Sequence, residues 1–348
     1  MKIIHCADIH LGSKIERNLT KVKSNERKNE IYNNFVRLIE YANDNNINHI
    51  IIAGDLFDTE KGNIKLIKDT ILLFSKNNNI SFYYLQGNHD ETILTGYELP
   101  SNVYTFSNDF KYYDIGNVRI GGKEAVNSKD IYFKDDKFNI LILHGNVVNG
   151  KPVNDEDINL NDFKDKNINY LALGHIHMRR DYKIDKNFTA SYSGCLEGRG
   201  FDECGEKGFY LLDIENKNLK QTFVPFYKRM SHEVRVDITG AKLYTDIIEK
   251  IKENTKKYAS VDLVKVILIG EYDVDLNKNI DAVKEKLESS FYLIKIEDES
   301  KLKLDPNDYI HDVSLLGEFV RTVINDDTIT NKDMVLTYGI KALRNEGI

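Results

Sequence analysis

Tryptophan is absent from the 348-residue sequence, and cysteine is rare. The three cysteines, Cys6, Cys195 and Cys204, are odd in number and show no CxxC spacing, which argues against a disulfide framework and a thiolate metal site. No apolar run approaches the roughly 20 residues that span a bilayer, and the opening run meets His5 and Asp8 too early for a secretory signal. We therefore expect a cytoplasmic protein with reduced thiols and no membrane contact.

An excess of positive charge is also missing, because the net charge is −7. This balance argues against a uniformly basic nucleic-acid binder, although a local basic groove or metal ions can still supply positive charge. A composition of 41% hydrophobic and 30% charged residues fits a globular protein, and the length suits two domains. We assign no aromatic residue to nucleic-acid stacking, and we expect Tyr83 and Tyr84 in a strand core.

The first 230 residues alternate strand-like and helix-like segments. Amphipathic helices are predicted over residues 24–45 and 64–76, each next to a buried strand. Strands joined by helical crossovers pair in parallel, and their helices pack on the sheet. The later strands have few helices between them and predict a second, more antiparallel sheet. The expected core is therefore an α/β (α+β) fold, a sandwich of two sheets flanked by helices.

The pattern restarts near residue 230. Strands alternate with helices at 243–258 and 280–291, which predicts a small separate α/β domain. After Pro306 two helices are expected, the first with a strongly apolar face. We therefore expect three parts: residues 1–230, 231–305 and 306–348.

Seven potential metal ligands occur where a hydrophobic run gives way to a glycine-containing turn. They are Asp8, His10, Asp55, Asn88, His144, His175 and His177. Each is expected at the carboxyl end of a buried strand, the edge at which α/β sheets bind ligands. Two divalent cations that share a bridging carboxylate need such imidazole and oxygen donors. The set therefore indicates hydrolysis of a phosphate ester.

Individual motifs differ in strength. Asp8 and His10 lie two apart at a strand end, so both side chains can reach one ion, but alone this motif is weak and more typical of a surface turn. Gly54 permits close backbone approach, and Asp55 can bridge two cations with its two oxygens. Only the ordered set makes a two-metal site the favoured interpretation.

His89 and Asp58 are the candidate catalytic residues. His89 follows the ligand Asn88 and cannot easily reach the same ion, which suits a general acid. Asp58 can hydrogen-bond His89 and fix its tautomer. The alternatives are a structural histidine in the turn and an ordinary acid in the first turn of a helix.

Three arginines are candidates for substrate binding. Arg179 and Arg180 follow His177 closely, and Arg199 lies in the "EGRGF" loop. Guanidinium groups beside a phosphate site hold a nucleic-acid backbone in bidentate geometry. The alternative is that they are solvated loop charges.

The ordered motifs DxH, GDxxD, GNHD, H and GHxH resemble those of the calcineurin-like metallophosphoesterases. The stretches "IIHCADIHLG", "LALGHIHMR" and "YSGCLEGRGFDECGEKGFYLLDI" are closer still to the SbcD-type DNA repair exonucleases, including the YhaO-like group. This resemblance implies that the α/β unit after residue 230 is a capping domain that helps to grip DNA. It also implies that His89 is the catalytic histidine, although some relatives have a histidine in place of Asp58.

Carried over residue by residue, the resemblance implies two ions bridged by Asp55. One ion is assigned to Asp8, His10 and His177, and the other to Asn88, His144 and His175. The mixture of carboxylate, amide and imidazole ligands suits Mn²⁺ best, with Fe or Zn as alternatives.

The favoured hypothesis is a Mn²⁺-dependent DNA nuclease, an exonuclease or endodeoxyribonuclease of DNA repair and end processing. By resemblance, its partners are DNA and an SbcC-type coiled-coil ATPase docked on helices 306–348, and the protein forms a homodimer. The terminal helices packing on their own domain is an equal alternative. Other readings are a small-molecule or cyclic-nucleotide phosphodiesterase or phosphatase, and a catalytically silent scaffold.

Overall fold

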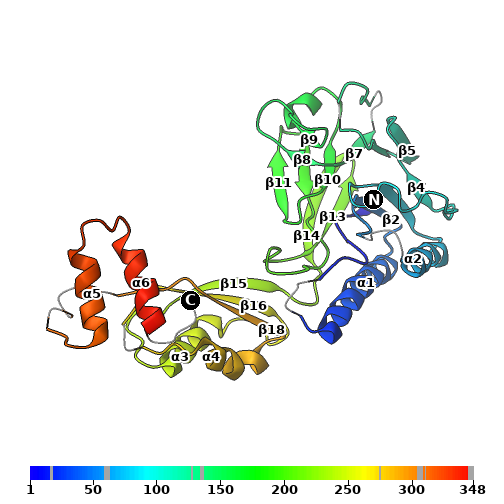
Figure 1. Cartoon of the computed structure of the whole chain (residues 1–348). Helices are drawn as coiled ribbons and strands as arrows, with labels where there is room; N and C mark the ends of the chain where they lie inside the picture. The colour runs from blue at the N-terminus through cyan, green and yellow to red at the C-terminus, as the bar shows by residue number, and fades with distance from the viewer. Residues whose placement is uncertain are drawn as a thin grey trace. The chain divides into compact units, whose positions relative to one another are not determined.

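A computed structural model describes residues 1–15, 19–58, 63–126, 128–133, 137–273, 276–303, 309 and 311–343. The chain forms two compact units, Met1–His232 and Glu233–Ile348 (Figure 1). None of the helices within the described residues is both long and apolar enough to cross a membrane. The described cysteines are free thiols, with Cys6 and Cys195 buried.

The first sheet of unit 1 contains six strands. In spatial order they are β14 (Asn218–Pro225), β13 (Gly208–Glu215), β1 (Lys2–Cys6), β2 (His49–Ala53), β3 (Ser81–Leu85) and β4 (Val103–Thr105). Strands β1 to β4 pair in parallel, whereas β13 and β14 add antiparallel neighbours. The carboxyl ends of β1, β2 and β3 therefore meet at one edge.

The second sheet also has six strands. Their spatial order is β11 (Arg180–Lys183), β12 (Thr189–Tyr192), β10 (Tyr170–Gly174), β7 (Phe138–His144), β6 (Val118–Gly122) and β5 (Lys111–Ile115). Its central strands β12, β10, β7 and β6 pair in parallel, and only the two edge pairings are antiparallel. The prediction of a more antiparallel second sheet is therefore wrong. Parallel pairing needs a crossover of a dozen or more residues, and the long segments between these strands supply it without a long helix.

The two sheets pack face to face, which confirms the predicted sandwich. Ile51 of β2 and Ile140 of β7 belong to the core between the sheets. Ile50 and Ile52 point the other way, toward α1 (Lys21–Asp44) and α2 (Ile64–Lys76). Since both faces of β2 are buried, it reads as a continuous hydrophobic run.

The outer face of the second sheet is covered differently. Leu141 and Leu171 pack against loop residues such as Phe133 and Phe188, and against the short 3-10 helix η1 (Leu160–Phe163). A small parallel ribbon of β8 (Asn146–Val147) and β9 (Asp157–Ile158) follows β7. Among the described residues, α-helices thus flank the first sheet, and loops cover the second.

Unit 2 is built on the three-stranded sheet β15 (Ser231–Asp237), β16 (Leu263–Ile269) and β18 (Leu293–Asp298). Its core packs against α3 (Tyr244–Thr255) and α4 (Ile280–Leu287), which is followed by the 3-10 helix η2 (Glu288–Ser290). A ribbon of β17 (Glu271–Tyr272) and β19 (Lys301–Leu302) precedes α5 (Leu315–Asn325) and α6 (Lys332–Leu343). The helices α5 and α6 share a small core of their own. A separate third part at 306–348 stays a prediction.

Candidate metal centre

The seven predicted ligands lie at the carboxyl ends of five strands in unit 1. Asp8 and His10 follow β1, Asp55 follows β2, and Asn88 follows β3, whereas His144 ends β7 and the pair His175 and His177 follows β10. Backbone hydrogen bonds join the loops, since Asp8 donates to Gly54 at 3.1 Å and His10 donates to Asp55 at 2.9 Å. The two sheets therefore bring all seven residues to one edge.

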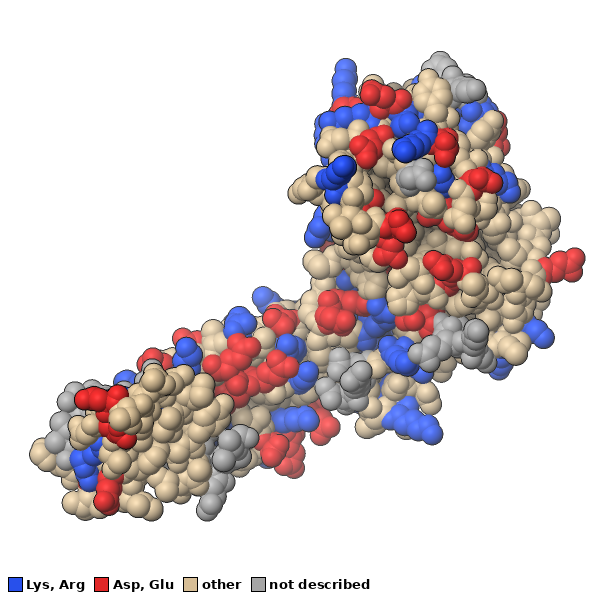
Figure 2. Space-filling view, turned by 45° about the horizontal axis from the view of Figure 1, so that its top comes forward, with Lys and Arg blue, Asp and Glu red and all other residues tan. Residues whose placement is uncertain are grey.

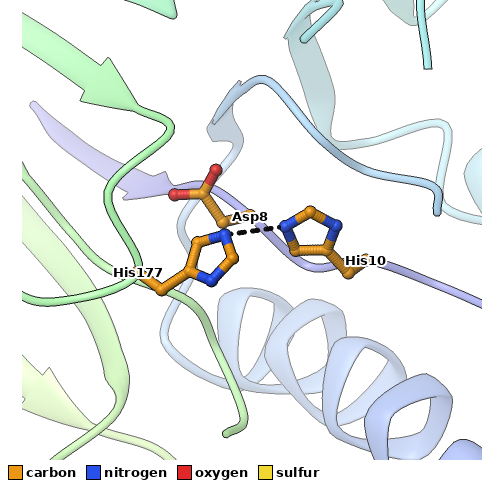
Figure 3. Close-up of side chains that lie close together, drawn as sticks. All are labelled: Asp8, His10 and His177. Atoms are coloured by element: carbon orange, nitrogen blue, oxygen red, sulfur yellow. Dashed lines mark hydrogen bonds between the residues drawn. The ribbon is translucent and has the colours of Figure 1, made fainter. Parts of the chain in front are cut away.

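Asp8, His10 and His177 form the first donor group (Figure 3). One potential ligand atom of each lies within 4.8 Å of the others. The Nε2 atoms of His10 and His177 face each other at 2.9 Å. Oδ2 of the buried Asp8 has no hydrogen-bond partner among the described residues, which leaves an acceptor for a ligand. Two imidazoles and a carboxylate are a fitting donor set for a divalent transition metal.

Asn88, His144 and His175 form the second donor group. Oδ1 of Asn88 lies 3.1 Å from Nε2 of His144 and 3.4 Å from Nδ1 of His175. His144 also belongs to a cluster with Asp8 and Asp55 whose ligand atoms lie within 4.8 Å of one another. An amide oxygen and two imidazoles fit a second divalent ion.

Asp55 stands between the two groups. Its Oδ2 lies 3.7 Å from Nε2 of His10 and 3.3 Å from Nε2 of His144. Its Oδ1 accepts a hydrogen bond of 3.0 Å from the backbone N–H of His89. One oxygen of Asp55 thus contacts both donor groups, as a bridging ligand requires.

The backbone is strained at the same residues. Asp8, His10, Asp55 and His175 have positive φ values of 52°, 51°, 50° and 103°. Non-glycine residues rarely adopt this region, and such outliers concentrate at functional sites. These residues bend the chain after β1, β2 and β10, so that their side chains lie in the site.

Glycines allow the motifs to pack this tightly. A Cβ on Gly54 would lie 1.9 Å from Nδ1 of His144, and one on Gly87 would lie 2.1 Å from Oδ1 of Asp55. A Cβ on Gly174 would lie 1.7 Å from the carbonyl oxygen of Ala53. The glycines in "GD", "GN" and "GH" are therefore steric requirements of the site.

Two of the imidazoles are oriented from behind. Nδ1 of His144 donates to the carbonyl oxygen of Ala53 at 2.9 Å, and Nδ1 of His177 lies 2.7 Å from Oε1 of Glu203. A hydrogen bond at Nδ1 fixes the tautomer that leaves the Nε2 lone pair for a metal. Both Nε2 atoms face into the site.

Burial and charge shift the pKa values of the donors. Burial raises the pKa of Asp8 to about 6. Burial opposes ionisation of Asp55, yet the hydrogen bond and charge of His144 outweigh it and lower the pKa of Asp55. Burial likewise opposes protonation of His144, but Asp55 and Asp8 raise the pKa of His144 to about 9. The site thus concentrates negative charge that a cation would stabilise.

His89 lies beside the donors, with Nδ1 at 3.1 Å from Oδ1 of Asp58. Its side chain is 44% exposed, so substrate can reach it. Arg199 donates from Nη1 to Oδ2 of Asp58 at 3.0 Å and from Nε to Oε1 of Glu203 at 2.8 Å. Arg199 therefore connects Asp58, the partner of His89, with Glu203, the partner of His177.

The other two arginines lie elsewhere. The guanidinium of Arg179 stacks over the Phe223 ring at 4.4 Å, and Nη1 of Arg180 donates to the Tyr182 hydroxyl at 3.4 Å. Both are exposed. Their predicted contact with substrate remains a prediction.

Two buried acids of the site were missed from the sequence. Glu203 holds His177, as described above. Asp90 accepts hydrogen bonds from Gly87 N–H at 2.7 Å and from Leu56 N–H at 2.8 Å, and so ties the turn after β3 to the turn after β2. The final aspartate of the GNHD motif could have identified Asp90 as a residue of the site. No motif around Glu203 indicated that it would contact a histidine.

Residues 1–179 match the calcineurin-like phosphoesterase family. This match covers more than half of the chain and includes all seven donors. The chain belongs to the calcineurin-like phosphoesterase family. The predicted family is confirmed, and the protein is a hydrolase acting on phosphoric ester bonds.

Three relatives show which members of the family this chain is similar to. The chain is 27% identical to the DNA double-strand break repair protein Mre11 of Methanococcus maripaludis, over 92% of this chain and 93% of the relative. It is 26% identical to the uncharacterized metallophosphoesterase YhaO of Bacillus subtilis, over 78% and 72%. It is 28% identical to a subunit of the nuclease SbcCD of Staphylococcus saprophyticus, over 65% and 69%. These relatives are consistent with a nuclease of the SbcD and Mre11 type.

Proposed function

We propose that this protein is a two-metal DNA nuclease that works best with Mn²⁺, with Fe or Zn as alternatives. The observation that carries the proposal is the position of Asp55 Oδ2, within 3.7 Å of His10 and 3.3 Å of His144. It makes one carboxylate common to two donor groups. Relatives named as part of a nuclease and as DNA break repair proteins support DNA as the substrate.

Each of the two donor groups is proposed to bind one ion. Asp8, His10 and His177 would hold one ion, Asn88, His144 and His175 would hold the other, and Asp55 would contact both. A bound pair would polarise the phosphodiester oxygens and supply hydroxide from water near neutral pH. The protein contributes the rigid strand ends and the tautomers fixed by Ala53 and Glu203.

His89 is the proposed general acid. Since Nδ1 faces Asp58, Nε2 is the nitrogen that can donate a proton to the departing 3′-oxygen. Arg199 holds Asp58 from the opposite side, so we propose a positioning role for Arg199 through Asp58 and Glu203. Its further contact with substrate phosphate stays a prediction.

Arg179 and Arg180 are the remaining candidates for contact with the DNA backbone. Both are exposed and follow the ligand His177 by two and three residues. On the face shown in Figure 2, acidic and basic side chains are interspersed over unit 1. A local contact by these two arginines therefore fits better than a broad basic surface.

The test compares DNA with a small ester. Purified protein stripped of metal should degrade single-stranded oligonucleotides and hydrolyse bis-p-nitrophenyl phosphate only after Mn²⁺ is restored, with Fe²⁺ and Zn²⁺ assayed in parallel. Turnover of the small ester without cleavage of DNA would favour the alternative, a small-molecule or cyclic-nucleotide phosphodiesterase or phosphatase. Turnover of neither substrate would favour a silent scaffold, although all seven donors and His89 are present.

We further propose an SbcC-type coiled-coil ATPase as partner. The pair α5 and α6 exposes large apolar side chains: Leu315, Met334, Val335, Tyr338 and Leu343. Figure 2 shows a broad uncharged surface on unit 2. One relative is itself named as one component of a larger nuclease. Co-purification with a neighbouring coiled-coil ATPase tests this, and Leu315→Asp should abolish it.

Two further expectations belong to the same proposal. A homodimer is expected by similarity, and light scattering of the full chain measures its mass. Cytoplasmic localisation accords with the free thiols of Cys6, Cys195 and Cys204.

A further inference from the structure

The two donor groups of the candidate metal centre differ in their access to solvent. A cleft of about 850 Å³ in unit 1 is lined by Asn88 and His144, two proposed ligands of the second group. None of Asp8, His10 and His177, the described residues of the first group, lines it. The cleft therefore leads to one donor group and not to the other.

Carboxylates dominate the charge of this cleft. Among the described residues that line it, Lys129 is the one lysine or arginine, and six residues are acidic: Glu91, Glu124, Asp155, Glu156, Asp157 and Asp162. Within the described part of the chain, none of these acids belongs to a group of three or more ligand atoms that could hold an ion. A cleft lined by charge of one sign concentrates ions of the opposite sign and accelerates their association by about 10–10³-fold. The acidic wall is thus an approach for cations rather than a binding site.

Two of the acids lie next to the turn that carries Asn88. In the amide orientation that satisfies both of its polar atoms, Gln86 donates to Oε1 of Glu124 and to the backbone oxygen of Glu91, each at 3.1 Å. Gln86 itself precedes Asn88 by two residues. The negative charge of the cleft therefore extends to the second donor group.

The first donor group is the more deeply buried of the two. Asp8 and His10 are at most 1% exposed, whereas Asn88 is exposed and His175 is partly buried. Exchange of an ion at buried ligands requires local opening of the structure around them, and such opening costs free energy. An ion in the first group is thus expected to exchange more slowly than an ion in the second.

The charges of the two groups differ in the same sense. Apart from the shared bridging ligand, the first group has the carboxylate Asp8 where the second has the neutral amide Asn88. The buried carboxylate of Glu203 contacts His177 at 2.7 Å, whereas His144 donates to a backbone carbonyl. A carboxylate behind a ligating histidine raises its basicity, and loss of such a partner typically costs about 10–100-fold in metal affinity. The first group should therefore bind a cation more tightly.

We propose that the two ions are unequal, with a resident ion in the first donor group and an ion in the second group that exchanges with solvent through the acidic cleft. This inference rests on the proposed two-metal function. The resident ion and Asp55 are in place before the second ion arrives, so hydrolysis follows the supply of free divalent cation. The cleft is the entry path through which that supply controls the enzyme.

The first experiment assigns the ions to the groups. The full chain, stripped of metal, is titrated with Mn²⁺, and free Mn²⁺ is measured by its electron paramagnetic resonance signal. Two steps are expected, with Kd values about tenfold or more apart, and Asp8→Asn should abolish the tight step. Asn88→Asp adds a negative charge to the second group and should tighten the weak step about tenfold. Asn33→Asp on the exposed face of α1 should change neither step.

The variants decide this experiment, because two neighbouring cations repel each other and equal groups would also fill in two steps. Loss of the weak step in Asp8→Asn, or an unchanged weak step in Asn88→Asp, would overturn the inequality of the two ions. Absence of any Mn²⁺ binding would instead remove the proposed two-metal function, and this inference with it.

The second experiment tests the path. Release of Mn²⁺ from the loaded chain into a chelating dye should show a fast and a slow phase. Asn108→Trp in the cleft wall should slow the fast phase and the loading of the second ion about threefold or more. The Kd of that ion should not change, because a narrower path alters rates but not the bound and free states.

Glu91→Gln with Glu124→Gln should slow loading of the second ion about threefold or more at low salt, and less at high salt. Asn33→Trp and Glu40→Gln on α1 are the matched controls. At saturating Mn²⁺ the cleft variants should hydrolyse bis-p-nitrophenyl phosphate at the wild-type rate, which separates the path from the proposed function. Wild-type rates of loading in both cleft variants would overturn the path.

Discussion

Unit 1 buries several charged groups among its strands and loops, whereas exposed ion pairs predominate in unit 2, in which Lys278 is a buried exception that pairs with Asp298. Arg235 and Glu299 of unit 2 form an ion pair in which 53% and 50% of the side chains are exposed. In unit 1, Asp8, His10 and Asp55 are almost fully buried. Burial of charge is unfavourable unless partners or ligands compensate it. The comparison favours a chemical role for the buried charge at the candidate metal centre of unit 1.

A second buried network in unit 1 supports the site from a distance. Arg27 Nη1 donates to Oε1 of Glu197 at 3.0 Å and also contacts Glu30, and Arg229 Nη2 donates to Oε1 of Glu30 at 2.7 Å. Glu197 lies two residues before Arg199, the residue that connects Asp58 with Glu203. The network thus anchors the loop that carries Arg199.

The largest effect is expected for Asp55→Asn. The change weakens the proposed bridging carboxylate, so Mn²⁺ binding should fall from two ions to one and hydrolysis should fall about 10⁴-fold or more. Isothermal titration and hydrolysis of bis-p-nitrophenyl phosphate measure the two quantities. Asp281→Asn, on an exposed residue of unit 2, is the matched control. Two bound ions in the Asp55 variant would refute the bridging role.

His89→Gln should reduce DNA cleavage by about 10²–10⁴-fold, because the leaving alkoxide loses its proton donor. The rate on bis-p-nitrophenyl phosphate should change much less, since its leaving group is stable as an anion. Mn²⁺ affinity should be unchanged, and His311→Gln in unit 2 provides the control. An equal loss on both substrates would assign His89 to structure rather than to proton transfer.

Arg27→Met should destabilise unit 1 by about 3–5 kcal/mol, because it leaves the buried Glu197 without its guanidinium partner, although Glu30 keeps Arg229. Arg235→Met in unit 2 should cost less than about 1 kcal/mol, because its ion pair is exposed. Hydrogen exchange with mass spectrometry reports each unit separately in the full chain. Similar losses of stability for the two variants would contradict the difference between the buried ion pair of unit 1 and the exposed ion pair of unit 2.

Arg199→Lys should lower DNA cleavage by roughly 10–100-fold through misplacement of Asp58 and Glu203. When Arg199→Lys is combined with Asp58→Asn, the loss of DNA cleavage should be smaller than the two single losses together, because both changes break the same connection. The double-mutant cycle is measured as kcat on DNA, with Mn²⁺ affinity as a second readout. Full additivity would place Arg199 outside this connection, in contact with substrate.

The smallest effect concerns pH. Burial opposes ionisation of Glu30, but hydrogen bonds from Arg229, Lys228 and Arg27 outweigh it and lower the pKa of Glu30 from 4.5 to about 2. The ionised Glu30 therefore stabilises the folded protein fully above pH 4.5, and this stabilisation is lost as the pH falls toward 2. The difference in Tm between wild type and Glu30→Gln should therefore shrink on acidification, while Glu253→Gln on α3 shows no such trend.

Local pattern was sufficient for most elements of the fold. The helix predicted at 64–76 forms over Ile64–Lys76, and the helix predicted at 24–45 forms over Lys21–Asp44. The earlier start follows from Thr20, whose side chain accepts from Lys23 N–H and caps the helix. Pairing direction in the second sheet was not predictable in this way, because it depends on crossovers rather than on periodicity.

The candidate donors of the site were visible because each lies at the end of a strand or within four residues after it. The side chains behind them were not, since their contacts join loops that are far apart in sequence. His177 and Glu203 are separated by 26 residues, and Arg199 and Asp58 by 141. No periodic pattern encodes such a pair, so the hydrogen bonds of Arg199 with Asp58 and Glu203 were not predicted from the sequence, and its contact with substrate stays a prediction.

The left-handed backbone at Asp8, His10 and Asp55 has a consequence for mutagenesis. Alanine disfavours this conformation, so an alanine scan would add steric strain to the loss of each ligand and overstate the chemical effect. Asparagine visits the region readily, and glycine relieves it. Comparison of the glycine with the alanine variant at each position therefore separates the strain that alanine adds from the loss of the side chain itself.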